Sequence, residues 1–145
     1  MNTQLEEVIS VFLSNVTDYS YLELETEDFN NEMYMLLRKA LSKFRYKDDI
    51  KIDTDLGEFN RELTDNEMHI ISLGMLSEYL KNKIYNIELL RMSLDSKDFK
   101  TYSKANHLKE LLELKSTTDA DFHYYMGVFN LDNALKDRMK KRWVT

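Results

Sequence analysis

The chain contains no proline and only three glycines in 145 residues, so few positions can interrupt a helix. Proline breaks helices because it lacks a backbone N–H, and glycine makes helix formation entropically costly. Leu, Glu, Lys and Met, which are good helix formers, are common along the chain. A chain of this length usually forms one domain. We therefore predict an all-α fold: a compact bundle of about four to six helices with an amphipathic C-terminal docking tail.

Composition and motifs argue against an enzyme. The absence of cysteine excludes disulfides, thiolate metal sites and cysteine nucleophiles. No glycine-rich phosphate loop, GxSxG elbow or HExxH motif occurs in the sequence. His69, His107 and His123 fall on different predicted helices, and a pair such as His107 and Glu110 is too few ligands for a metal site. We expect no catalytic residues, no cofactor, no metal and no membrane span.

Charge is distributed unevenly along the chain. The net charge is -6, and residues 1–30 carry seven acidic side chains with no Lys or Arg. Residues 136–145 carry five basic side chains against Asp137 alone. An acidic body with a basic end can bind nucleic acid, an acidic partner or the acidic end of a neighbouring copy, although solvated surface charge is an equally common explanation.

Apolar spacing in the first half predicts two helices and a loop. Residues 3–15 repeat apolar side chains every three and four positions, with Thr3 as the expected N-cap. After a loop, a second helix is expected behind Thr26 or Asn30, with acids in its first turn and Lys or Arg in its last. Residues 47–62 alternate charged and apolar side chains around Gly57, which indicates a loop or a short irregular turn.

The best-marked helix start is at Thr64. Glu67 lies three residues further on, as a capping box requires, and Leu63 can pack on Met68 as a hydrophobic staple. We predict a central core helix from here to about Lys83, with Gly74 as a point of close packing between helices.

The second half predicts several shorter helices. Asn86 can cap a short helix over 87–94, and a longer one is expected from about residue 98 to 115, with Leu111 and Leu112 on its buried side. The polar cluster 116–119 predicts a break or bend before a helix that bears aromatic residues. We therefore divide the chain into a helical bundle domain, 1–130, whose residues 1–25 form an acidic helix and loop, and a basic amphipathic segment, 131–145.

The C-terminal segment is the best candidate for a functional element. Leu131, Leu135, Met139 and Trp143 fall four residues apart and form an apolar ridge flanked by basic side chains. Such a helix can pack back on its own domain or lie on a membrane surface, but docking in a groove of a protein partner fits the pattern better. The predicted docking residues are Leu131, Leu135, Arg138, Met139, Lys140, Lys141, Arg142 and Trp143.

Two segments carry a family resemblance. The stretch DFKTYSKANHLKEL, residues 98–111, together with LTDNEM, residues 63–68, resembles small all-α neck proteins of tailed bacteriophages, the head–tail connectors or portal adaptors. The resemblance covers roughly residues 20–115. It implies a virion protein of the neck, made in the cytoplasm of the host bacterium. It also implies a ring, commonly of twelve copies, whose C-terminal segments dock on the portal protein and whose channel passes DNA without sequence-specific binding.

Residues 1–30 do not map onto this family. In the connector interpretation they contact neighbouring copies or the next neck protein, and the acidic body suits a conduit because like charge keeps passing DNA from sticking. The alternative function is a small regulatory protein of a phage or mobile element that binds a protein or nucleic-acid partner through its basic tail.

Overall fold

A computed structural model describes residues 1–17, 19–44, 50–93 and 102–143 of the chain. These residues form four α-helices, which confirms the predicted all-α bundle. One 3-10 turn and a two-stranded hairpin accompany the helices. The elements are α1 (Leu5–Leu13), η1 (Tyr19–Glu23), α2 (Thr26–Ser42), β1 (Ile52–Asp53), β2 (Glu58–Phe59), α3 (Asp65–Ser93) and α5 (Tyr102–Trp143).

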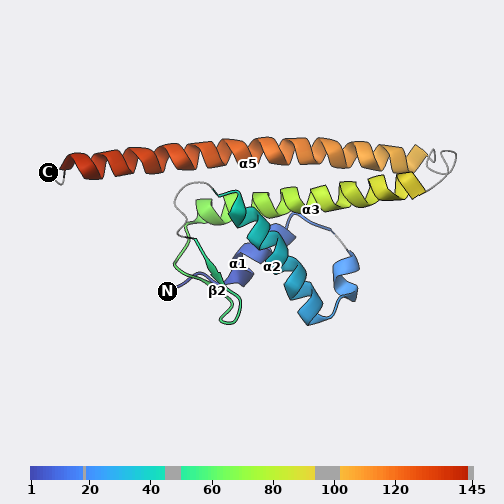
Figure 1. Ribbon diagram of the computed structural model, residues 1–145, viewed down its shortest axis with the longest axis horizontal. Coiled ribbons are helices and arrows are strands. Elements are labelled where there is room, and N and C mark those ends of the chain that lie inside the picture. Colours follow the sequence, from blue (N-terminus) through green and yellow to red (C-terminus); the bar gives the residue numbers. More distant parts are fainter. Residues whose placement is uncertain (18, 45–49, 94–101, 144–145) are drawn as a thin grey trace.

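The helix α3 is the centre of the molecule. It contacts α1 and α2 on one side and α5 on the other, and α3 and α5 run antiparallel (Figure 1). Every residue from Ile70 to Glu78 is buried, so this part of α3 shows no solvent-facing side. A helix surrounded in this way is apolar around most of its circumference rather than along one stripe. Its buried serines are hydrogen-bonded: Ser72 donates to the carbonyl of His69, and Ser77 donates to the carboxylate of Asp119.

The start of α3 has the capping box that the sequence predicts. The Glu67 N–H donates to Thr64 Oγ1 over 3.1 Å, and the Thr64 N–H donates to Glu67 Oε1 over 3.0 Å. Arg61 adds a hydrogen bond of 3.0 Å from Nη1 to Glu67 Oε1. These contacts satisfy backbone N–H groups that a helix start otherwise leaves without partners.

The N-terminal residues pair with a β-hairpin. The sequence predicted neither the hairpin nor this pairing. Residues 47–62 contain an antiparallel pair, β1 and β2, with Gly57 at a φ of +68° in the connecting turn. The Phe59 N–H donates to the Thr3 carbonyl over 2.8 Å. Thr3 therefore does not cap α1 as predicted, because its Oγ1 accepts from the Leu63 N–H at 2.8 Å. This contact ties the start of α1 to the start of α3.

The other predicted helix starts also need correction. The residue before α2 is Glu25, and no side-chain hydrogen bond caps this helix, so neither Thr26 nor Asn30 acts as the cap. The helix α3 continues past Lys83 to Ser93, so Asn86 does not start a separate helix. The predicted start near residue 98 lies outside the described residues.

The helix α5 runs unbroken through the interruption predicted at 116–119 and across the boundary drawn between residues 130 and 131. The polar side chains there form hydrogen bonds that are compatible with a helix. Thr117 Oγ1 donates to the Glu113 carbonyl one turn earlier, and Asn133 Nδ2 donates to the Phe129 carbonyl. Thr118 is buried, and Asp119 accepts hydrogen bonds from Ser77 of α3 and Lys115 of its own helix. Tertiary contacts thus stabilise a helix that local preferences would interrupt.

Three helices meet at Gly74, as the sequence predicted. A Cβ atom added there would lie 3.0 Å from Ala40 Cβ of α2 and 3.2 Å from Phe122 Cε2 of α5. We predict that Gly74→Ala lowers the free energy of unfolding by about 1–2 kcal/mol, because overpacking outweighs the higher helix propensity of alanine. Urea denaturation followed by circular dichroism measures the change.

Gly127→Ala is the matched control, since a Cβ atom at Gly127 meets nothing within 4 Å. We expect this change to raise the free energy of unfolding by about 0.5–1 kcal/mol. Equal effects of the two substitutions would contradict close packing at Gly74.

Candidate protein-docking surface

The helix α5 has two opposite faces. One packs on the bundle through Leu108, Phe122 and Met126, all of which are buried. At 3.6 residues per turn, residues spaced by three and four positions share a side of the helix. A second apolar line with this spacing lies on the opposite side and is exposed. We call it the outer stripe, and it consists of Tyr124, Val128, Leu131, Leu135 and Met139.

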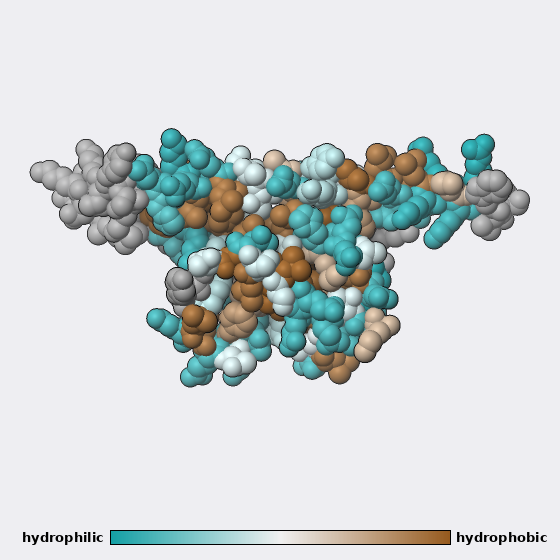
Figure 2. Space-filling model, turned by 180° about the vertical axis from the view of Figure 1, so that it is seen from behind, coloured by the Kyte–Doolittle hydropathy of each residue, from teal (hydrophilic) through white to brown (hydrophobic). Residues whose placement is uncertain are grey.

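The bundle-facing side of α5 loses its apolar residues before the helix ends. The last aromatic contact on that side joins Phe129 and Phe44, with ring centroids 5.0 Å apart. Asn133 and Asp137 then take the positions that would continue this face. Figure 1 shows that α5 projects beyond the start of α3. The stripe residues on this projecting end are exposed. Figure 2 shows hydrophobic side chains on the projecting end of α5, among hydrophilic ones.

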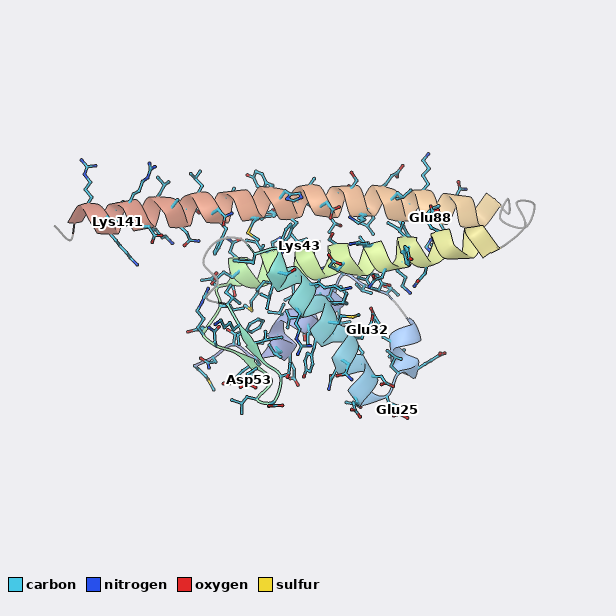
Figure 3. All side chains as sticks on the ribbon, in the orientation of Figure 1. Glu25, Glu32, Lys43, Asp53, Glu88 and Lys141 are labelled. Atoms are coloured by element: carbon cyan, nitrogen blue, oxygen red, sulfur yellow. The ribbon has the colours of Figure 1, made fainter. Side chains whose placement is uncertain are left out.

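The predicted docking residues gather on this projecting end. Leu131, Leu135 and Met139 are 60%, 49% and 60% exposed, so they do not pack back on the described part of the bundle. Arg138 and Arg142 each follow a stripe leucine by seven residues and therefore lie on the same side. Lys140, Lys141 and Arg142 occupy the last turn, and Figure 3 labels Lys141 there. Trp143 is the final residue of α5, but its side chain lies outside the described part of the structure.

The sequence did not predict the part of the outer stripe that lies where α5 still packs on the bundle. The predicted ridge began at Leu131 and did not include Tyr124 or Val128. Their spacing to Leu131 was the available signal, but the break expected at 116–119 and the boundary drawn after residue 130 divided one helix into three. Leu112, which we predicted to be buried, is 48% exposed, because the side of α5 that faces α3 passes through Leu108 and Phe122 rather than through Leu112.

Polar contacts hold α5 and α2 on α3. Lys43, the residue that follows α2, forms an ion pair with Glu78 of α3, with 2.8 Å between Nζ and Oε1. Asp119 of α5 accepts from Ser77 of α3 and pairs with Lys115 at 2.5 Å. Burial by itself would raise the pKa of the Glu78 and Asp119 carboxyls. The hydrogen bonds and charges of these lysines outweigh burial, so both pKa values lie below their ordinary range.

Other surfaces of the described residues offer no comparable site. A cleft of about 550 Å³ beside α5 is lined by Lys43, Lys115 and Asp119, among others, but these charges already pair as described above. His69 packs edge-on against Tyr125, with 5.0 Å between ring centroids. Within the described residues, no group of three or more His, Asp or Glu side chains could hold a metal ion. No helix in this part of the chain is long and apolar enough to cross a bilayer.

The lowered pKa values predict acid sensitivity. A carboxyl with a depressed pKa in the folded state contributes stability above its unfolded pKa, 4.5 for Glu and 3.8 for Asp, and loses it as the pH falls through the folded value. We expect the free energy of unfolding to be steady above pH 5 and to fall progressively below about 4.5. Urea denaturation between pH 7 and pH 3 measures it.

Two matched variants test whether the Glu78 carboxyl causes this pH dependence. Glu78→Gln should lower stability at pH 7 by about 1–2 kcal/mol and flatten the acid limb, because it removes one hydrogen-bonded ion pair. Glu110→Gln, on the exposed side of α5, should leave the profile unchanged. An unchanged profile in Glu78→Gln would contradict this assignment.

The chain was compared with known proteins at three levels. No family model, no curated protein and no solved structure matches it.

Proposed function

We propose that this chain is a structural protein of the tailed-bacteriophage neck, a head–tail connector or portal adaptor that docks on the portal protein through the end of α5. The observation that carries the proposal is the projection of α5 beyond the bundle with Leu131, Leu135 and Met139 exposed on one side. The resemblance of residues 63–68 and 98–111 to such proteins supplies the identity of the partner. Residues 63–68 form the start of α3.

The geometry suits helix-in-groove docking. Leu131, Leu135 and Met139 are spaced as anchors along one side of a helix, and such anchors insert into an apolar groove of a partner. Residues 131–143 span about 20 Å at 1.5 Å per residue, enough to reach a partner while the bundle stays outside the groove. Because the segment continues a helix that the bundle already holds, less conformational entropy is lost on binding. Arg138 and Arg142, which lie on the same side as the stripe leucines, then face an acidic groove rim.

The acidic body supports the rest of the connector proposal. Glu6 and Glu7 lie exposed on α1, and Glu25, Glu27 and Asp28 lie exposed around the start of α2. In a ring of copies on the portal, such acids line or flank the channel and keep passing DNA from binding. The protein is then a component of the virion neck and binds no DNA sequence.

The second candidate is a small regulatory protein of a phage or mobile element. The observation in its favour is the cluster Lys140, Lys141 and Arg142 in the last turn of a projecting helix. Such a cluster can bind the phosphates of a nucleic acid or an acidic protein. The remaining acidic surface opposes nucleic acid, so we rank this function second.

The proposal is tested by portal capture. An N-terminally tagged chain is purified from a lysate of the phage-infected host beside two variants, Leu131→Glu/Leu135→Glu and the control Leu112→Glu, which places one charge on an exposed part of α5 away from the outer stripe. We expect the wild type and the control to recover the portal protein. We expect the double variant to recover at least tenfold less, because each buried carboxylate costs several kcal/mol in a groove.

Purified particles provide the second readout. A connector is present in many copies per virion, whereas a regulator is absent from particles. Absence of the chain from virions, or recovery of a host factor or nucleic acid in place of the portal protein, would favour the regulatory function.

A further inference from the structure

The outer stripe extends beyond the projecting segment, residues 131–143, that the proposed docking uses. It begins at Tyr124, where α5 is still packed on the bundle, and runs without interruption to Met139. Its first three steps, of four, three and four residues, are those of a coiled-coil seam, and a further step of four reaches Met139. Extending the spacing toward the N-terminus reaches Asp121 and Thr117, both exposed. The apolar part is therefore flanked by Asp121 at one end and by Arg138 at the other.

Small residues lie beside the stripe. Ala120, Gly127 and Ala134 follow one another at seven-residue intervals, all on exposed positions next to the stripe. Glycine inside a helix costs about 1 kcal/mol relative to alanine. A Cβ atom at Gly127 would meet nothing within 4 Å, so no contact among the described residues requires glycine there. Small side chains beside an apolar seam allow a second helix to approach closely.

Charge along α5 changes sign. Residues 106–121 carry two lysines and four acids, whereas residues 131–143 carry five basic side chains and two acids. Two α5 helices side by side in parallel would place the basic ends together. In an antiparallel arrangement centred near residue 129, the basic end of one helix lies beside residues 116–121 of the other, which carry Asp119 and Asp121 and no Lys or Arg. Opposite charges then favour the pairing.

We propose that a second copy of this chain packs antiparallel on the outer stripe, α5 against α5, in a twofold symmetric dimer. Such an interface is isologous, so each contact occurs twice. A twofold axis between Phe129 and Asn130 brings the apolar positions together at the centre and opposite charges together at the ends. The facing pairs are Val128 with Leu131, Tyr124 with Leu135 and Asp121 with Arg138.

The two bundles do not collide in this arrangement. In Figure 1 the rest of the bundle lies on one side of α5, and the outer stripe lies opposite the face of α5 that packs on α3. In the proposed dimer each bundle therefore lies on the far side of the helix pair. The dimer covers Leu131 and Leu135, which are also docking residues. The free protein thereby hides its apolar surface until a partner competes for it. The inference does not rest on the proposed function, because self-association is measured on the purified chain alone.

Sedimentation equilibrium of the purified full chain tests the dimer. We expect a mass about twice that of one chain, falling to one chain on dilution. Leu131→Glu should weaken association at least tenfold, whereas Leu112→Glu, away from the stripe, should leave it unchanged. A monomer at all concentrations, or equal effects of the two variants, would overturn the proposal.

Charge exchange tests the pairing. Asp121→Arg and Arg138→Asp each place like charges opposite one another and should each weaken association several-fold. The double variant restores opposite charges and should recover association. Failure of the double variant to recover would overturn the proposed register. Circular dichroism of each variant establishes that the helices are intact.

The direction of pairing is read from spin labels. The chain has no native cysteine, so Lys141→Cys carries a single label. At 1.5 Å per residue, two such labels in the antiparallel dimer lie about 35 Å apart along the helix axes. A parallel pair places them within about 20 Å, set by the width of two helices and the label arms. A distance within about 20 Å between the two labels, measured by double electron–electron resonance, would overturn the antiparallel arrangement.

Discussion

Burial of α3 on all sides is the constraint on which the structure depends. The helices α1 and α2 cover one side and α5 covers the other, so removing any layer exposes apolar residues between Ile70 and Glu78. Gly74 lets the backbones of α2 and α3 approach, with Phe122 of α5 against the same point. Interiors packed this densely transmit small volume changes, because no void absorbs them. The register of α3 therefore fixes where α5 lies and how far it projects.

Polar contacts complement this packing by specifying a single arrangement. An apolar helix interface tolerates sliding by a turn, whereas a buried hydrogen-bonded pair is satisfied in one register only. The pair of Ser77 with Asp119 and the pair of Lys43 with Glu78 join α3 to α5 and to α2. At the other end of α3, Thr3 and Arg61 bring the N-terminus and the hairpin to the capping box. The pair of Ser77 with Asp119 therefore fixes which side of α5 faces α3 and leaves the outer stripe on the opposite side.

The sequence predicted features that depend on near neighbours and missed those that depend on distant ones. The capping box of Thr64 and Glu67 involves residues three apart, so its signal is complete in the sequence. The interruption expected at 116–119 was wrong because Thr118 is buried and Asp119 accepts a hydrogen bond from Ser77 of α3, 42 residues earlier. The contact from Leu63 to Thr3 likewise spans sixty residues, and no local pattern predicts it. Leu131, Leu135 and Met139 were identified by spacing alone, whereas Val128 required the unbroken helix.

The sequence by itself determined the helical class, the main capping signal, the polarity of charge and the apolar ridge near the C-terminus. Each of these follows from propensity, spacing or composition, which act within a few residues. Only the tertiary structure decided that α5 is one helix with two opposite apolar faces and that one of them finds no partner among the described residues. Which face of a helix is buried depends on the element that packs against it. A periodic pattern locates an apolar stripe but does not identify the element or the partner that covers it.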